Sequence, residues 1–163
     1  MKRICLFPGT FDPVTLGHVD IIKRAISLFD EIVVGIGTNS NKKTMFSEEK
    51  RKQWLELIFK DEPKISVAVY EGLTINFCKT IGAKYILRGI RFVSDFEYEL
   101  QLGYLNNSLD DTIETVYLMP KLQHAFISSS IVRNLLKFNA KTEHLVPKEV
   151  QKIIKSMRSC TLQ

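Results

Sequence analysis

The first loop of the sequence has the residue types of a phosphate-binding turn. It reads Pro8-Gly9-Thr10-Phe11-Asp12-Pro13-Val14-Thr15-Leu16-Gly17-His18, between a short β-branched run and a stretch with helical apolar spacing. A small hydroxyl and an imidazole beside a helix start can hold an anion, because the first N–H groups of a helix lack partners within it. We expect Gly9 to adopt a backbone conformation closed to other residues. The alternative is an ordinary turn in which His18 is a capping or partly buried residue.

Two groups of cations follow later strands. Lys42-Lys43 lies in the second loop, where a lysine can act as a point charge on a phosphate, although such pairs are more often solvated. Arg88-Gly89-Ile90-Arg91 follows the fourth predicted strand, and its guanidinium groups suit phosphate oxygens. We expect Gly89 to let a ligand approach the backbone. The alternative is that the arginines pair with acidic residues of the next helix, Asp95, Glu97 or Glu99.

A fourth loop carries three consecutive hydroxyls. It reads His124-Ala125-Phe126-Ile127-Ser128-Ser129-Ser130 and leads into a predicted helix. One serine is enough for an N-cap, so three indicate a second phosphate site. The P-loop pattern and the dinucleotide-binding fingerprint are both absent, and the pair of glycines in Gly35-Ile36-Gly37 is weak evidence without a third.

Short β-branched runs alternate with amphipathic stretches, a pattern typical of a parallel sheet built from βαβ units. The expected strands are 3–7, 31–37, 65–70, 84–87 and 115–119. The expected helices are 17–29, 47–60, 74–81 closed by Gly82, a helix ending near 109, 128–138 and 147–157. Ser94 and Glu97 have capping-box spacing. The prediction is one doubly wound, Rossmann-like α/β domain over residues 1–163, with five parallel strands and a helical tail from about 133. Ligands of such sheets bind beyond the carboxyl ends of the strands.

The chain resembles the bacterial pantetheine-phosphate adenylyltransferases from about Lys2 to Pro147. The resemblance is carried in order by Pro8 to Pro13 with Thr15-x-Gly17-His18, Arg88-Gly89-x-Arg91, Ser94 to Glu99, Met119-Pro120 and Phe126 to Ser130. It implies transfer of the adenylyl group of ATP to phosphopantetheine, which gives dephospho-coenzyme A and pyrophosphate. A related enzyme acting on nicotinate mononucleotide or a polyol phosphate is the nearest alternative.

The resemblance also assigns roles to residues. His18 and Thr10 would contact the α-phosphate, and the expected catalytic set is His18, Thr10, Lys42 and Arg91. The ATP-binding residues would be Thr10, Phe11, His18, Gly89, Ile90, Arg91, Glu99, His124, Ala125, Phe126, Ile127, Ser128, Ser129 and Ser130. The acceptor would meet Thr10, Lys42, Leu73, Thr74, Arg88, Leu102 and Asn106, with Leu105 beside them, although these apolar residues fit a plain helix core equally well. His124 stands where an aromatic ring often meets the adenine.

The implied reaction needs little covalent chemistry from the protein. The attacking phosphate oxygen is already ionised at neutral pH, so positioning and charge stabilisation are sufficient. Magnesium is expected to arrive with ATP, because the sequence has no carboxylate cluster for an all-protein cage. The resemblance further implies a homo-oligomer, usually a hexamer, and coenzyme A as a possible feedback ligand.

Composition bounds the remaining possibilities. The 163 residues are 45% hydrophobic and 25% charged, the range of globular domains, and the net charge is +5. Residues 133–163 hold seven basic and two acidic residues and so carry the whole excess, which weakens a nucleic-acid or other polyanion partner. Three widely spaced cysteines, Cys5, Cys78 and Cys160, indicate a reducing compartment. With no apolar stretch long enough to cross a bilayer, we expect a cytoplasmic location and no membrane partner.

Overall fold

Five parallel strands form the centre of the computed structural model, which describes residues 2–38 and 43–160, the side chains of 157–160 excepted. They are β1 (Ile4–Gly9), β2 (Glu31–Thr38), β3 (Ile65–Glu71), β4 (Tyr85–Gly89) and β5 (Glu114–Leu118). Their order in the sheet is β3-β2-β1-β4-β5, as predicted for a doubly wound fold. The strand order therefore reverses between β1 and β4, where such folds bind ligands beyond the strand ends.

The two sides of β1 are paired very differently. Six residue pairs join β1 to β2, from Ile4 opposite Glu31 to Gly9 opposite Ile36. Only two pairs join β1 to β4, namely Cys5 with Tyr85 and Leu6 with Ile86. Beyond Leu6 the ladder between β1 and β4 stops, and the two strands leave room for a cleft.

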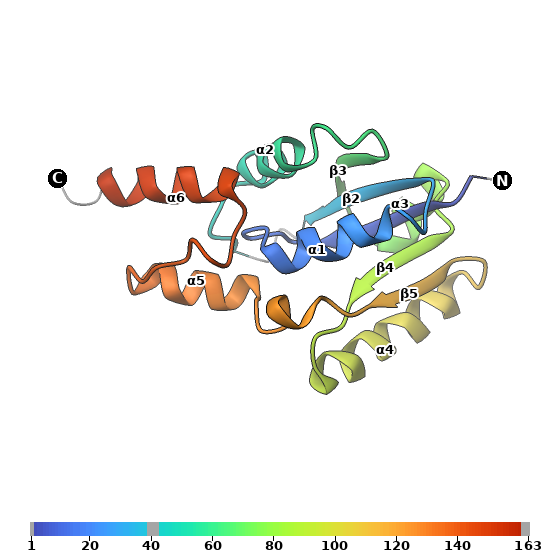
Figure 1. Ribbon diagram of the computed structural model, residues 1–163. Coiled ribbons are helices and arrows are strands. Elements are labelled where there is room, and N and C mark those ends of the chain that lie inside the picture. Colours follow the sequence, from blue (N-terminus) through green and yellow to red (C-terminus); the bar gives the residue numbers. More distant parts are fainter. Residues whose placement is uncertain (1, 39–42, 161–163) are drawn as a thin grey trace.

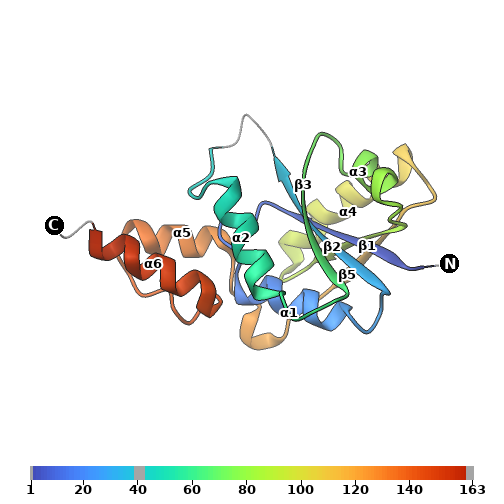
Figure 2. The same cartoon turned by 90° about the horizontal axis from the view of Figure 1, so that it is seen from above.

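Helices cover both faces of the sheet, as the continuous apolar strands require. Helices α1 and α2 lie on one side of the sheet and α3 and α4 on the other (Figure 2). Helices α5 and α6 extend from the sheet toward the C-terminus (Figure 1). The helices are α1 (Leu16–Ala25), α2 (Glu48–Ile58), α3 (Thr74–Ile81), α4 (Val93–Leu109), α5 (Ser129–Lys137) and α6 (Lys148–Cys160), with a short 3₁₀ turn at Leu122–His124. No helix of the described residues is long and apolar enough to cross a membrane.

The core has one part on each face. On the α1 and α2 face, Ile22, Trp54 and Leu55 are fully buried against strand residues, and helices α5 and α6 extend this cluster through residues such as Val132 and Val150. On the α3 face, a smaller cluster contains Leu6, Val33, Ile75, Cys78, Ala83, Ile86 and Ile113. The sheet is thus fixed from both sides, and its carboxyl edge is a rigid base for side chains.

Several predicted element boundaries were confirmed and others were wrong. Gly82 ends α3 in the left-handed conformation, as expected, with φ of 68°. The first helix stops at Ala25 instead of Phe29. The prediction of a capping box at Ser94 is wrong, because α4 begins at Val93 and its N-cap is Phe92. There the Asp95 carboxylate reaches back to the N–H of Arg91 at 3.2 Å and stabilises the helix start in place of the predicted serine.

Candidate active site

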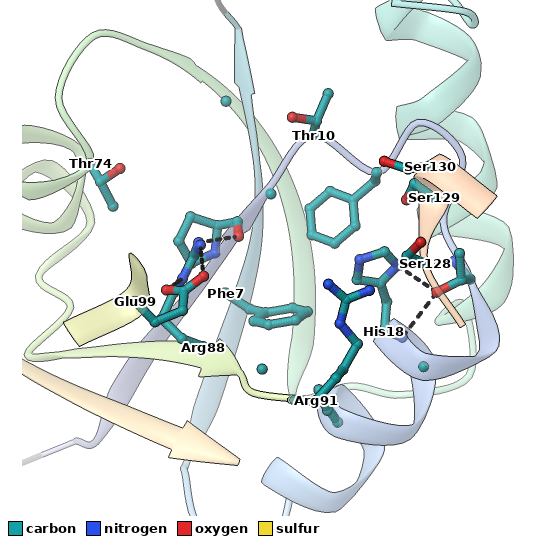
Figure 3. Close-up of a pocket in the computed structure, with 18 of the residues that line it drawn as sticks. Phe7, Thr10, His18, Thr74, Arg88, Arg91, Glu99, Ser128, Ser129 and Ser130 are labelled. Carbon is teal, nitrogen blue, oxygen red and sulfur yellow. Dashed lines mark hydrogen bonds and ion pairs between the residues drawn. The ribbon is translucent and has the colours of Figure 1, made fainter. Parts of the chain in front are cut away.

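A cleft of about 860 Å³ opens at the carboxyl ends of β1 and β4. Most of the loops singled out from the sequence contribute to its wall (Figure 3). Its lining residues are Phe7, Pro8, Gly9, Thr10, Phe11, Thr15, Gly17, His18, Ile21, Gly37, Thr38, Tyr70, Glu71, Gly72, Thr74, Arg88, Gly89, Arg91, Tyr98, Glu99, Pro120, Ile127, Ser128, Ser129 and Ser130. The cleft lies where the sheet order reverses, the position in which open α/β sheets bind ligands.

His18 is fixed by the start of its own helix. Thr15 is the N-cap of α1, and its hydroxyl accepts a hydrogen bond from the His18 N–H at 3.4 Å. In return, Nδ1 of His18 accepts the backbone N–H of Thr15 at 3.0 Å, which completes a capping box. An accepting Nδ1 carries no proton, so the neutral ring has its proton on Nε2. The capping alternative considered for His18 is thus correct, and it coexists with a place in the cleft.

The surroundings of His18 keep its ring uncharged. Burial, together with the positive charges of Arg91 and Arg88, lowers its pKa from 6.5 to about 4. The Phe11 ring meets the imidazole edge-on, with centroids 5.2 Å apart. Phe11 itself is 2% exposed and has a φ of 51°, a left-handed conformation that is uncommon outside glycine. At neutral pH the residue can therefore donate a hydrogen bond from Nε2 but cannot supply a charge.

Arg88 spans the gap where the pairing of β1 and β4 ends. Its Nη1 donates to the Pro8 carbonyl oxygen at 3.1 Å, so a side chain joins strands whose backbones have separated. Its Nε and Nη2 donate to the two carboxylate oxygens of Glu99, each at 2.6 Å. A two-pronged pair of this kind fixes the plane of the guanidinium. Figure 3 shows the pair at the opposite end of the cleft from Ser128 to Ser130.

Arg91 points toward His18 from the start of α4 (Figure 3). Its Nε donates to Asp95 at 2.9 Å and its Nη1 donates to the Ile127 carbonyl oxygen at 3.4 Å. The alternative that the arginines of this loop pair with acidic residues of the next helix is correct for both: Arg88 pairs with Glu99 and Arg91 with Asp95. Each side chain remains partly exposed, at 25% for Arg88 and 32% for Arg91, and both residues line the cleft, where they can still contact a ligand.

The three serines at the start of α5 each have a protein partner. Ser128 is the N-cap and its hydroxyl accepts the N–H of Ile131 at 3.1 Å. Ser129 donates to the Pro13 carbonyl oxygen at 2.8 Å, and the Ser130 hydroxyl accepts from Arg133 at 3.1 Å. The N-terminal end of α5 nevertheless faces the cleft (Figure 3), where the helix dipole favours an anion.

Known proteins match this chain closely over nearly its whole length. Residues 6–135 match the family model described as cytidylyltransferase-like. The phosphopantetheine adenylyltransferase of Nautilia profundicola is 54% identical over 93% of this chain and 99% of its own length. Those of Flavobacterium johnsoniae and Helicobacter pylori are 54% and 47% identical, over 91% and 94% of this chain and 97% and 98% of their own lengths. The chain belongs to the phosphopantetheine adenylyltransferase family.

The fold of this chain is also found in a solved structure. A candidate nicotinate-nucleotide adenylyltransferase from Vibrio parahaemolyticus superimposes with a TM-score of 0.72, over 94% of this chain and 99% of that one, at 18% identity. At this identity the likeness concerns the fold alone. The sequence resemblance to the adenylyltransferase family and the predicted Rossmann-like fold are both confirmed.

Not every residue expected from the family resemblance lines the cleft. Lys42 lies outside the described residues. Leu102 and Asn106 are on α4, three and seven residues after Glu99 and therefore on the same face of that helix. Leu105 and Leu73 are more than half exposed. Other expected residues lie beside the lining without being part of it, namely Ile90, His124, Ala125 and Phe126.

The structure corrects the expectation for Gly9 and adds a packing role for Gly89. Gly9 does not have a positive φ; the left-handed residue of the loop is Phe11. A Cβ at Gly9 would lie 2.8 Å from the Phe11 ring, so the glycine makes room for that ring. A Cβ at Gly89 would come within 2.5 Å of the terminal methyl of Ile21, so a larger residue there would displace this side chain of α1.

The sequence analysis missed the residues that hold the first loop in place. The buried Arg51 of α2 donates to the Thr10 carbonyl oxygen at 2.7 Å and to that of Phe46 at 3.2 Å. The Asp12 carboxylate accepts the N–H groups of Met45 and Phe46 at 2.8 and 2.9 Å. Arg51 reads as part of a charged Lys-Arg-Lys triplet, yet it lies three and four residues before the buried pair at 54–55. That spacing is the signal that could have placed it on the inner face of its helix.

Proposed function

We propose that this chain transfers the adenylyl group of ATP to phosphopantetheine, giving dephospho-coenzyme A and pyrophosphate. The observation that carries the proposal is its 47–54% identity to phosphopantetheine adenylyltransferases over more than nine tenths of the chain. The cleft supports the proposal because a neutral histidine, two arginines and the N-terminus of α5 all face it. A site of this kind can hold two phosphate-bearing substrates at once.

The proposed reaction is a direct in-line displacement. A phosphate oxygen of phosphopantetheine forms a bond to the α-phosphorus of ATP, while the bond to the bridging α,β oxygen breaks and pyrophosphate leaves with that electron pair. The attacking oxygen is already ionised, so no base and no covalent enzyme intermediate are required. The protein contributes positioning and stabilisation of the negative charge that develops at the α-phosphate.

In this proposal His18 donates from Nε2 to an α-phosphate oxygen. The Thr15 N–H holds Nδ1 at 3.0 Å and thereby points the opposite nitrogen of the ring outward. A neutral donor that is fixed before the substrates arrive costs no reorganisation during the reaction. Thr10, on the neighbouring loop, contacts the same phosphate region.

The two arginines serve different substrates. Arg88, oriented by Glu99 and Pro8, binds the phosphate of phosphopantetheine together with Lys42. Arg91 lies between His18 and the loop that leads into α5, and it binds the polyphosphate of ATP. Around ATP we also place Phe11, Gly89, Ile90, Glu99 and the loop from His124 to Ser130, and along the pantetheine arm Leu73, Thr74, Leu102 and Asn106.

Magnesium is proposed to enter with ATP. Across the described residues, no three His, Cys, Asp or Glu side chains come together as a possible metal site. The two carboxylate oxygens of Glu99, in the cleft, already accept hydrogen bonds from Arg88. The described part of the chain therefore supports magnesium that is bound by ATP, and the steps above rely on the protein's own groups.

We also propose self-association, with a hexamer as the expected state. Helix α4 and its N-cap expose several large apolar side chains, among them Val93 at 80%, Tyr104 at 68% and Phe92 at 53%. Exposed apolar surface of this kind is typical of contacts between chains. Light scattering coupled to size-exclusion chromatography measures the number of chains in the oligomer.

Coenzyme A is expected to compete with both substrates, because it contains a phosphopantetheine part and an adenylyl part.

The decisive experiment measures pyrophosphate release from ATP by the purified protein. Release should require phosphopantetheine and should yield dephospho-coenzyme A in equal amount. Nicotinate mononucleotide serves as the alternative acceptor. Release that is independent of any acceptor, or faster with nicotinate mononucleotide, would contradict the proposal.

A further inference from the structure

The glycine pair of β2 provides the space for a tyrosine at the edge of the cleft. Gly37 lies directly opposite Tyr70 of β3. A Cβ at Gly37 would be 3.2 Å from the Tyr70 hydroxyl oxygen, and one at Gly35 would be 3.1 Å from its ring. Gly35-Ile36-Gly37 thus has a role unrelated to a nucleotide fingerprint: its two glycines let the Tyr70 side chain lie flat across β2.

Tyr70 is held on its other side by α3. Its ring stacks on that of Phe77 with centroids 4.5 Å apart and planes at 3°. Its hydroxyl lies 3.0 Å from the hydroxyl of Thr74, the first residue of α3. The N-cap of α3 is Leu73, and no side chain caps this end of the helix. The Thr74 hydroxyl, one residue further on, is hydrogen-bonded to Tyr70 instead.

The relative acidity of the two hydroxyl groups favours one direction of this hydrogen bond. A phenol is a much stronger acid than an aliphatic alcohol, so Tyr70 is the better donor and Thr74 the better acceptor. A Thr74 hydroxyl that accepts from Tyr70 retains its own proton for donation. Hydrogen bonds in such a chain polarise one another, so the second donor is strengthened by the first. Tyr70 and Thr74 both line the cleft, and Thr74 lies on the side away from His18 (Figure 3).

We propose that Tyr70 is a positioning residue for the acceptor substrate, acting through Thr74. It sets the rotation of the Thr74 hydroxyl so that this group donates to an amide carbonyl oxygen of the phosphopantetheine arm. This inference rests on the proposed function, because it concerns how the acceptor of that reaction is held. Tyr70 needs no contact with the reacting phosphates and should therefore affect acceptor affinity more than turnover.

The test compares steady-state kinetics of Tyr70→Phe with the unchanged protein. The variant keeps the ring and its stacking on Phe77, and equal thermal denaturation midpoints will check its folding. We expect the KM for phosphopantetheine to rise about three- to tenfold, the effect of losing one neutral hydrogen bond. The KM for ATP should stay within twofold and kcat should change less than the acceptor KM. Tyr85→Phe, which removes a hydroxyl outside the cleft lining, is the matched control and should leave all three unchanged.

A double-mutant cycle separates this role from a purely structural one. If Tyr70 acts through Thr74, then Tyr70→Phe should have little further effect on the acceptor KM in a Thr74→Val background. Multiplication of the two effects would overturn the inference, and so would an unchanged acceptor KM in Tyr70→Phe alone. The failure of the proposed function is seen separately, as the absence of phosphopantetheine-dependent pyrophosphate release by the unchanged protein.

Discussion

The Nδ1 atom of His18 accepts the backbone N–H of Thr15 at 3.0 Å, so the ring that faces the cleft is oriented by the N-cap of its own helix. One contact therefore has two consequences. It satisfies a donor at the start of α1, and it fixes the tautomer that presents Nε2–H to a ligand. The stability of α1 and the chemistry of the site depend on the same side chain.

The depressed pKa of His18 predicts an acid-sensitive contribution to stability. Its pKa is about 4 in the folded chain and near 6.5 when unfolded, so between these values the unfolded chain binds more protons. The free energy of unfolding should then fall as the pH drops from 6.5 toward 4 and should be unaffected above 6.5. At pH 5 the loss due to this group is about 1 to 2 kcal/mol.

Urea denaturation at pH 7.5 and pH 5 measures this effect. The difference between the two pH values should be smaller in His18→Gln than in the unchanged protein. His144 is exposed, and His144→Gln serves as the control that should follow the unchanged protein. Equal pH differences in all three proteins would show that His18 titrates normally in the folded state.

Loss of the imidazole should reduce turnover. We expect His18→Ala to lower kcat about 10²- to 10³-fold, or 2.7 to 4 kcal/mol, the usual effect of removing a donor to a transition-state oxyanion. Both KM values should change much less, because the donor acts mainly when charge develops. Initial rates of pyrophosphate release at saturating ATP and phosphopantetheine test this. A normal kcat with a raised KM would assign His18 to substrate binding alone.

Lys42 is expected to serve the acceptor phosphate. Replacing it by Met should raise the KM for phosphopantetheine about tenfold, the effect of losing a charge-assisted hydrogen bond, with a smaller effect on ATP. The neighbouring exposed Lys43, changed to Met, is the control and should behave like the unchanged protein. Equal weakening of both substrates would mean that Lys42 contacts the nucleotide.

Arg51 links α2 to the loop that carries Thr10. Arg51→Met leaves the carbonyl oxygens of Thr10 and Phe46 without this donor, which should cost about 2 to 4 kcal/mol of the free energy of unfolding and lower kcat. Denaturant unfolding followed by circular dichroism gives the first quantity, and pyrophosphate release the second.

The control for Arg51 is another arginine that donates to a backbone carbonyl. Arg24 donates to Met119 at 2.6 Å but is 43% exposed and lies outside the cleft lining. Arg24→Met should therefore cost less than about 1 kcal/mol and leave kcat unchanged. If the two variants behaved alike, the proposed support of the Thr10 loop would be wrong.

The alternation of strands and helices was sufficient to predict the sheet, because strands covered on both faces must be apolar throughout. The placement of His18 in the site followed from its position after the first strand. The sequence alone did not indicate which of Asp95, Glu97 and Glu99 pairs with Arg88. Glu99 is eleven residues away, and only the packing of α4 beside β4 brings it to 2.6 Å.

At two positions the local sequence pattern is overruled by other contacts in the structure. Ser94 has the spacing of a helix cap, yet Asp95 forms the local contact because its carboxylate also pairs with the Arg91 guanidinium. Arg51 belongs to a run of basic residues, yet it is 4% exposed, and its guanidinium donates to the carbonyl oxygens of Phe46, just before α2, and of Thr10 in the first loop. The partner of Asp95 is only four residues away in the sequence, whereas the Thr10 carbonyl oxygen is brought to Arg51 by the fold and cannot be inferred from neighbouring residues.

The early end of the ladder between β1 and β4 has a consequence for redesign. Because the two strands part after Leu6 and Ile86, main-chain geometry sets the width of the cleft. Side chains on its walls can then be exchanged to alter which acceptor fits, while the opening itself persists. Directed evolution toward new acceptors should accordingly select changes on α3 and α4, and should leave the strands that frame the opening untouched.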